Sequence, residues 1–313
     1  MHDALPATAQ RRDLQALLPY LLLVLTMFFW SSNWVVGRAL HGQVPPIAIN
    51  FWRWTAASLI LLPFSWHQFR GKWPVIRRHW LVLCGLGVSG VGLFHSLVYT
   101  GLSETTAINA LLLNSVLPAM IICTSWLWHR ETISLRQAAG IVVSFAGALA
   151  IIARGQPAML LSLSVNRGDL WIALALPIWG IYSVMLRQRP MQLGALAFLQ
   201  VISVIGVASI APFYVWELLQ GGRMPVDLPT AAAILYVALG ASLLSYVFWN
   251  YAVARVGANT AGFTVHLMPA FGTVMAVIFL GEAVHAYQVL GISLILAGVF
   301  VSTSAGRRPG AAA

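Results

Sequence analysis

The chain has 313 residues, of which 59% are hydrophobic and only 8% are charged, and its formal net charge is +10. Soluble domains carry about 25% charged residues, so this composition excludes an ordinary soluble protein and indicates one that crosses a membrane several times. The basic residues lie in short loops between apolar runs. They therefore reflect membrane topology and do not indicate a nucleic-acid partner.

The N-terminal run "RRDLQALLPYLLLVL" resembles a signal sequence, but no small-residue cleavage site follows it and the apolar run continues to Trp30. We therefore expect a first span that is retained. Further apolar runs of about 18 or more residues, separated by helix breakers, predict ten membrane-spanning helices in all. Their approximate ranges are 17–38, 47–65, 80–101, 107–128, 134–153, 169–186, 195–216, 230–252, 259–280 and 286–303.

The loop charges predict the orientation of the chain. An even number of spans places both termini on one side of the membrane. Of the 18 Lys and Arg side chains, Arg53 lies within a span, and four lie on the side opposite the termini, namely Arg38, Arg154, Arg167 and Arg223. The remaining 13 share the side of the termini, which the positive-inside rule makes cytoplasmic. The expected protein is an all-α, multi-pass protein of the cell (inner) membrane.

The two halves of the chain resemble each other. "NSVLPAMIICTSWLWHRETISLRQAAGIVVSFAG" from Asn114 matches "VHLMPAFGTVMAVIFLGEAVHAYQVLGISLILAG" from Val265 at an offset of 151 residues, and "FWSSNWVVGR" from Phe29 matches "IWGIYSVMLR" from Ile178 at an offset of 149. Each unit has five spans, so the second unit is inverted, as in many secondary transporters. The expected divisions are a cytoplasmic tail (1–16), the first repeat (17–153), an external linker (154–168), the second repeat (169–303) and a cytoplasmic tail (304–313).

Several of these motifs resemble the EamA-type transporters of the drug/metabolite transporter superfamily. They are the W-S-S-N of the first span, segment 46–53, the stretches 118–131 and 269–282, and the Q-x2-G openings of the fifth and tenth spans. Within that superfamily the tryptophan-rich sequence resembles most the YddG-like aromatic amino acid exporters. The first repeat departs from the pattern at "HRE" (129–131), where the family usually shows G-E. The resemblance implies the same two-repeat fold and a function in export.

Polar side chains inside a bilayer are energetically costly, so each is a candidate for function. All eight acidic residues fall in tails, loops or span ends, which argues against a buried carboxylate relay. Arg53, His95 and His266 are the only basic groups expected well inside spans. A rise of about 1.5 Å per residue places His95 in the outer half of the membrane, and the inverted repeat moves its counterpart Tyr246 to the inner half.

These polar residues are expected to line one cavity at two depths, with tryptophans between the two levels. For each residue alone, a second interpretation stays open, in which the side chain only hydrogen-bonds across helices. The expected cavity residues are Trp30, Asn33, His95, Tyr99, Asn114, Ser115, Trp179, Tyr182, Tyr246, Trp249, Asn250 and His266.

Arg53 and two prolines have open interpretations. Arg53 lies about 10 Å into the second span, where it either binds a solute carboxylate or has a structural role, and the resemblance implies the structural role. Pro118 and Pro269 lie mid-span and act as bending points for gating or as tolerated kinks.

Other residues of the spans are expected to anchor or pack the helices. Six tryptophans near span ends are expected to be interfacial anchors: Trp34, Trp52, Trp54, Trp66, Trp73 and Trp80. Small residues predict close packing of the fifth and tenth spans within the chain: Gly140, Ser144, Gly147, Gly291 and Gly298.

The sequence predicts no enzyme, no metal and no cofactor. The only lysine, Lys72, follows "WHQFRG", so no phosphate-binding loop for ATP exists, and no hydrolase motif occurs. The expected function is a secondary transporter or facilitator that exports small amphipathic metabolites, above all aromatic and other neutral amino acids, by alternating access. Downhill export is favoured, since proton coupling would have to use His95 or His266.

Two alternatives stay open. A multidrug exporter of planar aromatic cations is weakened by the lack of a deep carboxylate. A non-transporting membrane scaffold would use the polar residues only for packing. The expected partners are the lipid bilayer and a small-molecule substrate. The sequence leaves the oligomeric state open, and a monomer is compatible with it.

Overall fold

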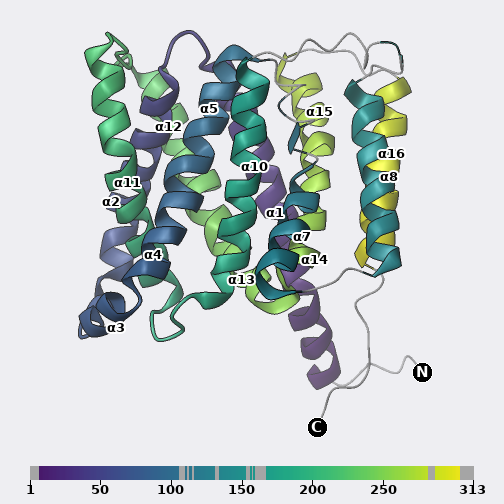
Figure 1. Ribbon diagram of the computed structural model, residues 1–313, viewed down its shortest axis with the longest axis horizontal. Coiled ribbons are helices and arrows are strands. Elements are labelled where there is room, and N and C mark those ends of the chain that lie inside the picture. Colours follow the sequence, from purple (N-terminus) through teal and green to yellow (C-terminus); the bar gives the residue numbers. More distant parts are fainter. Residues whose placement is uncertain are drawn as a thin grey trace.

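The computed structural model describes residues 7–105, 110, 113–114, 116–130, 134–152, 156, 158, 167–280 and 286–303. Every regular element within these residues is a helix, and the helices form an elongated bundle (Figure 1). This agrees with the all-α prediction. A pair of helices, α8 and α16, lies at one edge of the bundle, and α2 and α11 lie at the opposite edge.

Within the described residues, six helical segments are long and apolar enough to cross a membrane: 16–39, 46–69, 80–104, 170–188, 195–219 and 228–256. Six of the predicted spans correspond to them. In element terms they are α1 (Ala7–Ala39), α2 (Pro46–Phe69), α4 (Trp80–Leu86) with η1 (Gly87–Leu93) and α5 (Phe94–Glu104), α10 (Arg167–Met185) with η2 (Leu186–Gln188), α11 (Ala195–Leu219), and α12 (Leu228–Val237) with η3 (Ala238–Leu244) and α13 (Ser245–Val256).

The other four predicted spans also contain helix. The elements are α7 (Leu117–His129), α8 (Leu135–Ile152), α14 (Ala258–Phe263) with η4 (Thr264–His266) and α15 (Leu267–Leu280), and α16 (Ala286–Thr303). A short helix, α3 (Trp73–Arg78), joins α2 to α4. The count of ten spans and the side of the termini stay predictions.

The third helix of each half contains a π-helical stretch at the same place in the repeat. The stretches η1 and η3 begin at Gly87 and Ala238, which are 151 residues apart. A π-helix shifts the backbone bonds from i−4 to i−5 and often marks a functional site. Carbonyls of both stretches accept side-chain bonds from other helices: Gly90 O from the Tyr246 hydroxyl, and Ala241 O from Trp30 Nε1 at 3.2 Å. The sequence pattern gave no sign of this feature.

The two prolines lie beside helical irregularities, and their role in gating stays a prediction. Pro118 is the second residue of α7, which begins after the turn residue Val116. Pro269 is the third residue of α15, which continues without interruption from α14 through the 3-10 helix η4. A proline is tolerated in the first turn because the backbone N–H there has no helical partner.

The ends of α2 and α11 cap each other. Glu217 near the end of α11 accepts from the N–H groups of Ile47 and Ala48 at 3.0 and 2.7 Å, and Gln68 near the end of α2 accepts from the N–H of Ala197 at 3.3 Å. The two helices are therefore antiparallel. Glu217 lies 149 residues after Gln68, and Ala197 lies 149 residues after Ala48, so the two caps are repeat counterparts.

The predicted close packing of small residues is present between α8 and α16. A Cβ added at Gly298 of α16 would lie 2.6 Å from the Gly140 oxygen of α8, so only glycine allows this approach. Ser144 and Gly140 are buried in the same contact. The packing is intramolecular, as expected.

Four of the six tryptophans expected as anchors are exposed, and two are not. Trp52, Trp66, Trp73 and Trp80 expose 38% or more of their surface. Trp34 and Trp54 are buried, so their interpretation as interfacial anchors is wrong. Trp34 follows Trp30 by four residues and therefore shares its inward face of α1.

Candidate functional site

Aromatic side chains from both halves of the chain meet at the centre of the bundle. Trp30 of α1, Trp179 of α10 and Trp249 of α13 are buried, and their ring centroids are 5.0 Å (Trp30–Trp179), 5.2 Å (Trp30–Trp249) and 5.9 Å (Trp179–Trp249) apart. The Trp30 and Trp179 rings are nearly perpendicular, at 89°. Edge-to-face pairs of this kind contribute about 0.5–1.5 kcal/mol beyond their burial. All three tryptophans were predicted to lie at the site.

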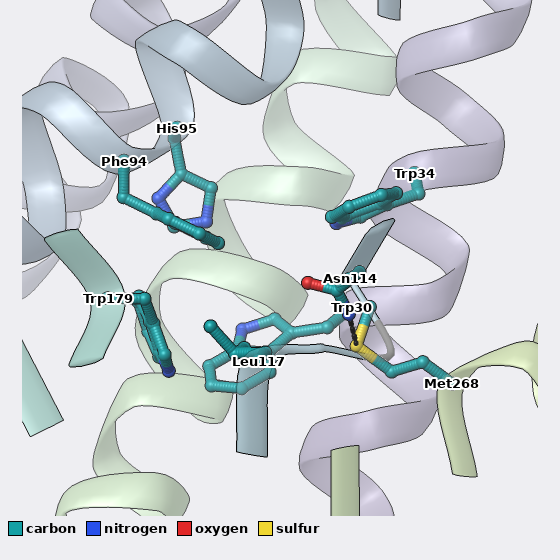
Figure 2. A pocket seen from close by; sticks show the side chains of 8 residues that line it. All are labelled: Trp30, Trp34, Phe94, His95, Asn114, Leu117, Trp179 and Met268. Carbon is teal, nitrogen blue, oxygen red and sulfur yellow. Dashed lines mark hydrogen bonds between the residues drawn. The ribbon is translucent and has the colours of Figure 1, made fainter. Parts of the chain in front are cut away.

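A small cavity of about 10 Å³ lies beside this cluster, and Figure 2 shows the side chains around it. A volume of this size holds about one water molecule. The space that the described residues enclose here therefore has no room for a metabolite, and we call this arrangement closed. The lining residues are Trp30, Trp34, Phe94, His95, Asn114, Leu117, Trp179 and Met268.

The cavity lies where the two repeats meet. Trp30 and Trp179 are repeat counterparts, and so are Leu117 and Met268, and all four line the same space. Leu117 and Met268 each directly precede a proline near the start of a helix, Pro118 in α7 and Pro269 in α15. The Asn114 amide donates to Met268 Sδ at 3.5 Å across the cavity wall (Figure 2).

Four of the predicted residues line the cavity: Trp30, His95, Asn114 and Trp179. Sequence reasoning missed Trp34, Phe94, Leu117 and Met268. The repeat offset contained a signal for the last two, because they align with each other and lie beside the paired prolines. Phe94 offered no such signal, since an apolar residue in an apolar span is indistinguishable from ordinary packing.

The first repeat contributes a buried polar network. Arg53 Nη1 donates to Asn33 Oδ1 at 3.1 Å and to the Tyr99 hydroxyl at 2.8 Å, and that hydroxyl donates to Asn33 Oδ1 at 2.5 Å. The guanidinium carbon lies 5.4 Å from the ring centre of Trp54 and 5.5 Å from that of Tyr99. Arg53 is fully buried, so it does not snorkel to the membrane surface.

The second repeat contributes a simpler pair. The Tyr182 hydroxyl donates to Asn250 Oδ1 at 2.8 Å, and both residues are buried. Tyr182 is the repeat counterpart of Asn33, and Asn250 is the counterpart of Tyr99. The same bond therefore occurs in both halves, with tyrosine and asparagine exchanged between the helices.

The predicted separation of His95 and Tyr246 into an outer and an inner level is wrong. His95 Nδ1 lies 3.5 Å from the Tyr246 hydroxyl, and the two rings are 6.2 Å apart. These counterparts meet because the third helix of each repeat passes the same central cluster. Counting residues along one helix gives depth but does not give the crossing point.

Two further predicted residues lie apart from the cavity or outside the described residues. His266 of η4 is buried, and neither of its ring nitrogens has a hydrogen-bond partner. It does not line the cavity. Ser115, its repeat counterpart, lies outside the described residues.

Comparisons with known proteins agree with this architecture. The model of the EamA-like transporter family matches residues 17–153 and 166–304. A crystal structure of a protein with 20% sequence identity superposes with a TM-score of 0.69, covering 92% of this chain and 97% of that one, which shows that the two share a fold.

Three relatives carry transport names. An "uncharacterized transporter" of Archaeoglobus fulgidus is 28% identical over 91% of this chain and 97% of its own length. A "probable terminal-alkyne amino-acid exporter" of Streptantibioticus cattleyicolor is 24% identical over 89% of this chain and 91% of its own. A "probable amino-acid metabolite efflux pump" of Salmonella typhimurium is 24% identical over 90% and 93%. With the family model matched twice along nearly the whole length, the chain belongs to the EamA-like transporter family and is a multi-pass membrane transporter.

Proposed function

We propose that the protein is a secondary carrier that exports small amphipathic metabolites, above all aromatic and other neutral amino acids, by alternating access between its two repeats. The observation that carries this proposal is the closed cavity lined by the repeat counterparts Trp30 and Trp179 and by Leu117 and Met268. A site shared by counterparts from both repeats can be opened from either side by moving one repeat against the other.

The aromatic cluster suits an aromatic or apolar side chain. In the closed arrangement the tryptophans pack on one another, and a substrate ring would replace these contacts with similar ones. The opening motion has places to occur, because helical irregularities lie next to lining residues. The π-helical stretch η1 ends directly before Phe94, and the 3-10 helix η4 ends two residues before Met268.

The relatives from Salmonella typhimurium and Streptantibioticus cattleyicolor are named for amino-acid metabolites and amino acids, which supports this substrate class. Preference for aromatic members, as in the YddG-like exporters, rests on the tryptophan cluster alone. A carrier of planar cations is disfavoured, because the fully buried Arg53 places a positive charge 5.4 Å from the ring of Trp54. Tyr246 links that ring to the cluster, since its centroid is 4.8 Å from that of Trp54 and 6.3 Å from that of Trp30.

The proposal includes ten spans, cytoplasmic termini and location in the cell (inner) membrane. Transport is downhill and not coupled to protons. Flux that is unchanged by an imposed pH gradient is the expected result, whereas flux that depends steeply on the gradient would contradict this part of the proposal.

The test is flux of labelled phenylalanine, tryptophan and threonine from liposomes that contain the purified protein. Flux above that of empty liposomes is expected for at least one of them, and flux for none would reject the proposal. Trp179→Ala should lower the flux about tenfold by removing the central ring. Trp216→Ala is the matched control, because Trp216 belongs to the same repeat as Trp179, is 63% exposed and does not line the cavity. Equal effects of both substitutions would favour a scaffold.

A further inference from the structure

The Arg53 side chain has an unusual environment. It is fully buried in a membrane-spanning helix, and its bonds go to two neutral groups, the Asn33 amide oxygen and the Tyr99 hydroxyl. Among the residues that the structure describes, no carboxylate forms a hydrogen bond with it. A buried cation without a counter-charge is costly, so its retention indicates either a strong structural need or an anion that arrives from outside.

The unpaired atoms of this network are all donors. Arg53 Nε and Nη2 and Asn33 Nδ2 are buried and have no hydrogen-bond partner. Nε and Nη2 form one edge of the guanidinium, with two parallel N–H groups that match the two oxygens of a carboxylate. An ionised carboxylate accepts hydrogen bonds and donates none, so it suits a site at which every unpaired polar atom is a donor.

The two residues that bond Arg53 are neighbours of cavity-lining residues along their helices. Asn33 lies on α1 between Trp30 and Trp34, which both line the cavity, and Tyr99 follows the lining residue His95 by one helical turn. A solute with its ring among the tryptophans and its carboxylate at Arg53 would span roughly one turn, ~5 Å. This is the size of a small aromatic or branched amino acid.

We propose that Arg53, with Asn33 beside it, binds the carboxylate of the transported solute, so that the protein selects ligands that carry a carboxylate and rejects the same molecules without one. This proposal rests on the proposed function, because it takes the cavity to be the solute site. Tyr99 holds the guanidinium in place from the side opposite the idle edge.

The experiment measures binding by the purified protein, by intrinsic tryptophan fluorescence and by the shift in melting temperature. Three probes share one ring: phenylalanine, 3-phenylpropionate, which lacks the amine, and phenethylamine, which lacks the carboxylate. The wild-type protein should bind the first two at least about tenfold more tightly than the third, as expected for a charge-assisted bidentate pair. Equal affinity for phenethylamine and 3-phenylpropionate would overturn the proposal, and so would binding of neither carboxylate.

Two substitutions separate recognition from folding. Arg53→Gln should lower the affinity for both carboxylates at least about tenfold and remove the preference over phenethylamine. Arg53→Lys keeps the charge and loses the planar fork, so it should show a smaller loss and keep the preference. If Arg53→Gln does not fold, the Arg53→Lys variant and the wild-type ranking decide the question. A folded Arg53→Gln protein with wild-type affinities would show that Arg53 is purely structural.

The matched control is Arg38→Gln. Arg38 lies on α1 and is only partly buried. Its Nη1 donates to Leu102 O at 3.2 Å, so Arg38 has a structural hydrogen bond but no buried, unpaired guanidinium edge. It should leave the affinities for all three probes unchanged. A protein that binds carboxylates but moves no amino acid would contradict the proposed function alone. Amino acid flux without any carboxylate preference would contradict this inference alone.

Discussion

The same tyrosine–asparagine hydrogen bond is built into both repeats, but only the first repeat has a buried charge beside it. In the first repeat Arg53 binds both members of the Asn33–Tyr99 pair. In the second repeat the Tyr182–Asn250 pair has only the half-buried Arg189 as an electrostatic neighbour of Tyr182, and the repeat counterpart of Arg53 is Ile202. The duplicated scaffold is therefore pseudo-symmetric in its bonds and asymmetric in its charge.

This difference makes the two faces of a duplicated protein unequal. Two equal halves present two equal faces to a solute, whereas one buried cation makes its own side of the bundle the more attractive one for an anion. The shared bonds hold the helices of each repeat together, and the charge distinguishes the repeats.

The largest effect is expected from removing the asparagine of each pair. Asn33→Leu leaves Arg53 with one of its two acceptors, so the free energy of unfolding should fall by about 2 kcal/mol. Asn250→Leu breaks a neutral bond between membrane helices and should lower it by about 0.6 kcal/mol. Unfolding by titration with sodium dodecyl sulfate measures both. Equal losses would show that the charge adds nothing to the first network.

A smaller effect is expected at the two reciprocal caps of α2 and α11. Glu217 carries a charge and accepts two N–H bonds, whereas Gln68 is neutral and accepts one at 3.3 Å. Glu217→Gln should lower the free energy of unfolding by about 0.5–1 kcal/mol. Gln68→Glu should raise the free energy of unfolding by about 0.3 kcal/mol.

The same detergent titration checks these two changes. Glu104→Gln is the matched control, because Glu104 is an exposed carboxylate at the end of α5. If Glu104→Gln lowers the free energy of unfolding as much as Glu217→Gln does, then the change in net charge and not the loss of the cap explains the result.

The smallest effect is expected where the third helix of each repeat begins. The Asp227 carboxylate caps α12 by accepting from the Thr230 N–H at 2.8 Å, and its hydrogen bonds with Thr230 hold the pKa of Asp227 below its usual value. The corresponding helix α4 begins after His79, whose side chain makes no cap. A lowered pKa means that the cap is present above about pH 4 and is lost as the pH falls further.

Hydrogen exchange at the first turn of α12, corrected for intrinsic rates, should therefore show weaker protection at pH 3 than at pH 5. Asp227→Asn should remove this dependence, since asparagine caps without titrating. The first turn of α4 serves as the internal reference. A similar change there would attribute the effect to a general loosening at low pH.

The pattern of apolar runs predicted the helices well. The six long segments of the structure correspond to six predicted ranges, and the other four ranges also contain helix. The repeat offset anticipated more than the spans, since the counterparts Trp30 and Trp179 meet at the site. Hydropathy is a local property, and the lipid requires each backbone to satisfy itself, so such features can be read residue by residue.

The details of the site could not be read in this way. Depth along a helix suggested that His95 and Tyr246 lie at different levels, yet they touch. Trp34 and Trp54 were assigned to the membrane surface, yet they are buried. In each case the face of the helix and its crossing with a neighbour decided the outcome, and neither follows from the position of a residue within its span.

The sequence by itself determined that this protein is a duplicated bundle of membrane helices with few polar residues inside, because composition and periodicity control how a chain meets lipid. The tertiary structure decided which of those residues act together. Only helix packing brought Asn33 and Tyr99 to Arg53, closed the tryptophan cluster to a cavity of about 10 Å³, and left one edge of the guanidinium without a partner. Contacts between distant segments depend on crossing angles and on close approach at small residues, and these are set by the whole bundle.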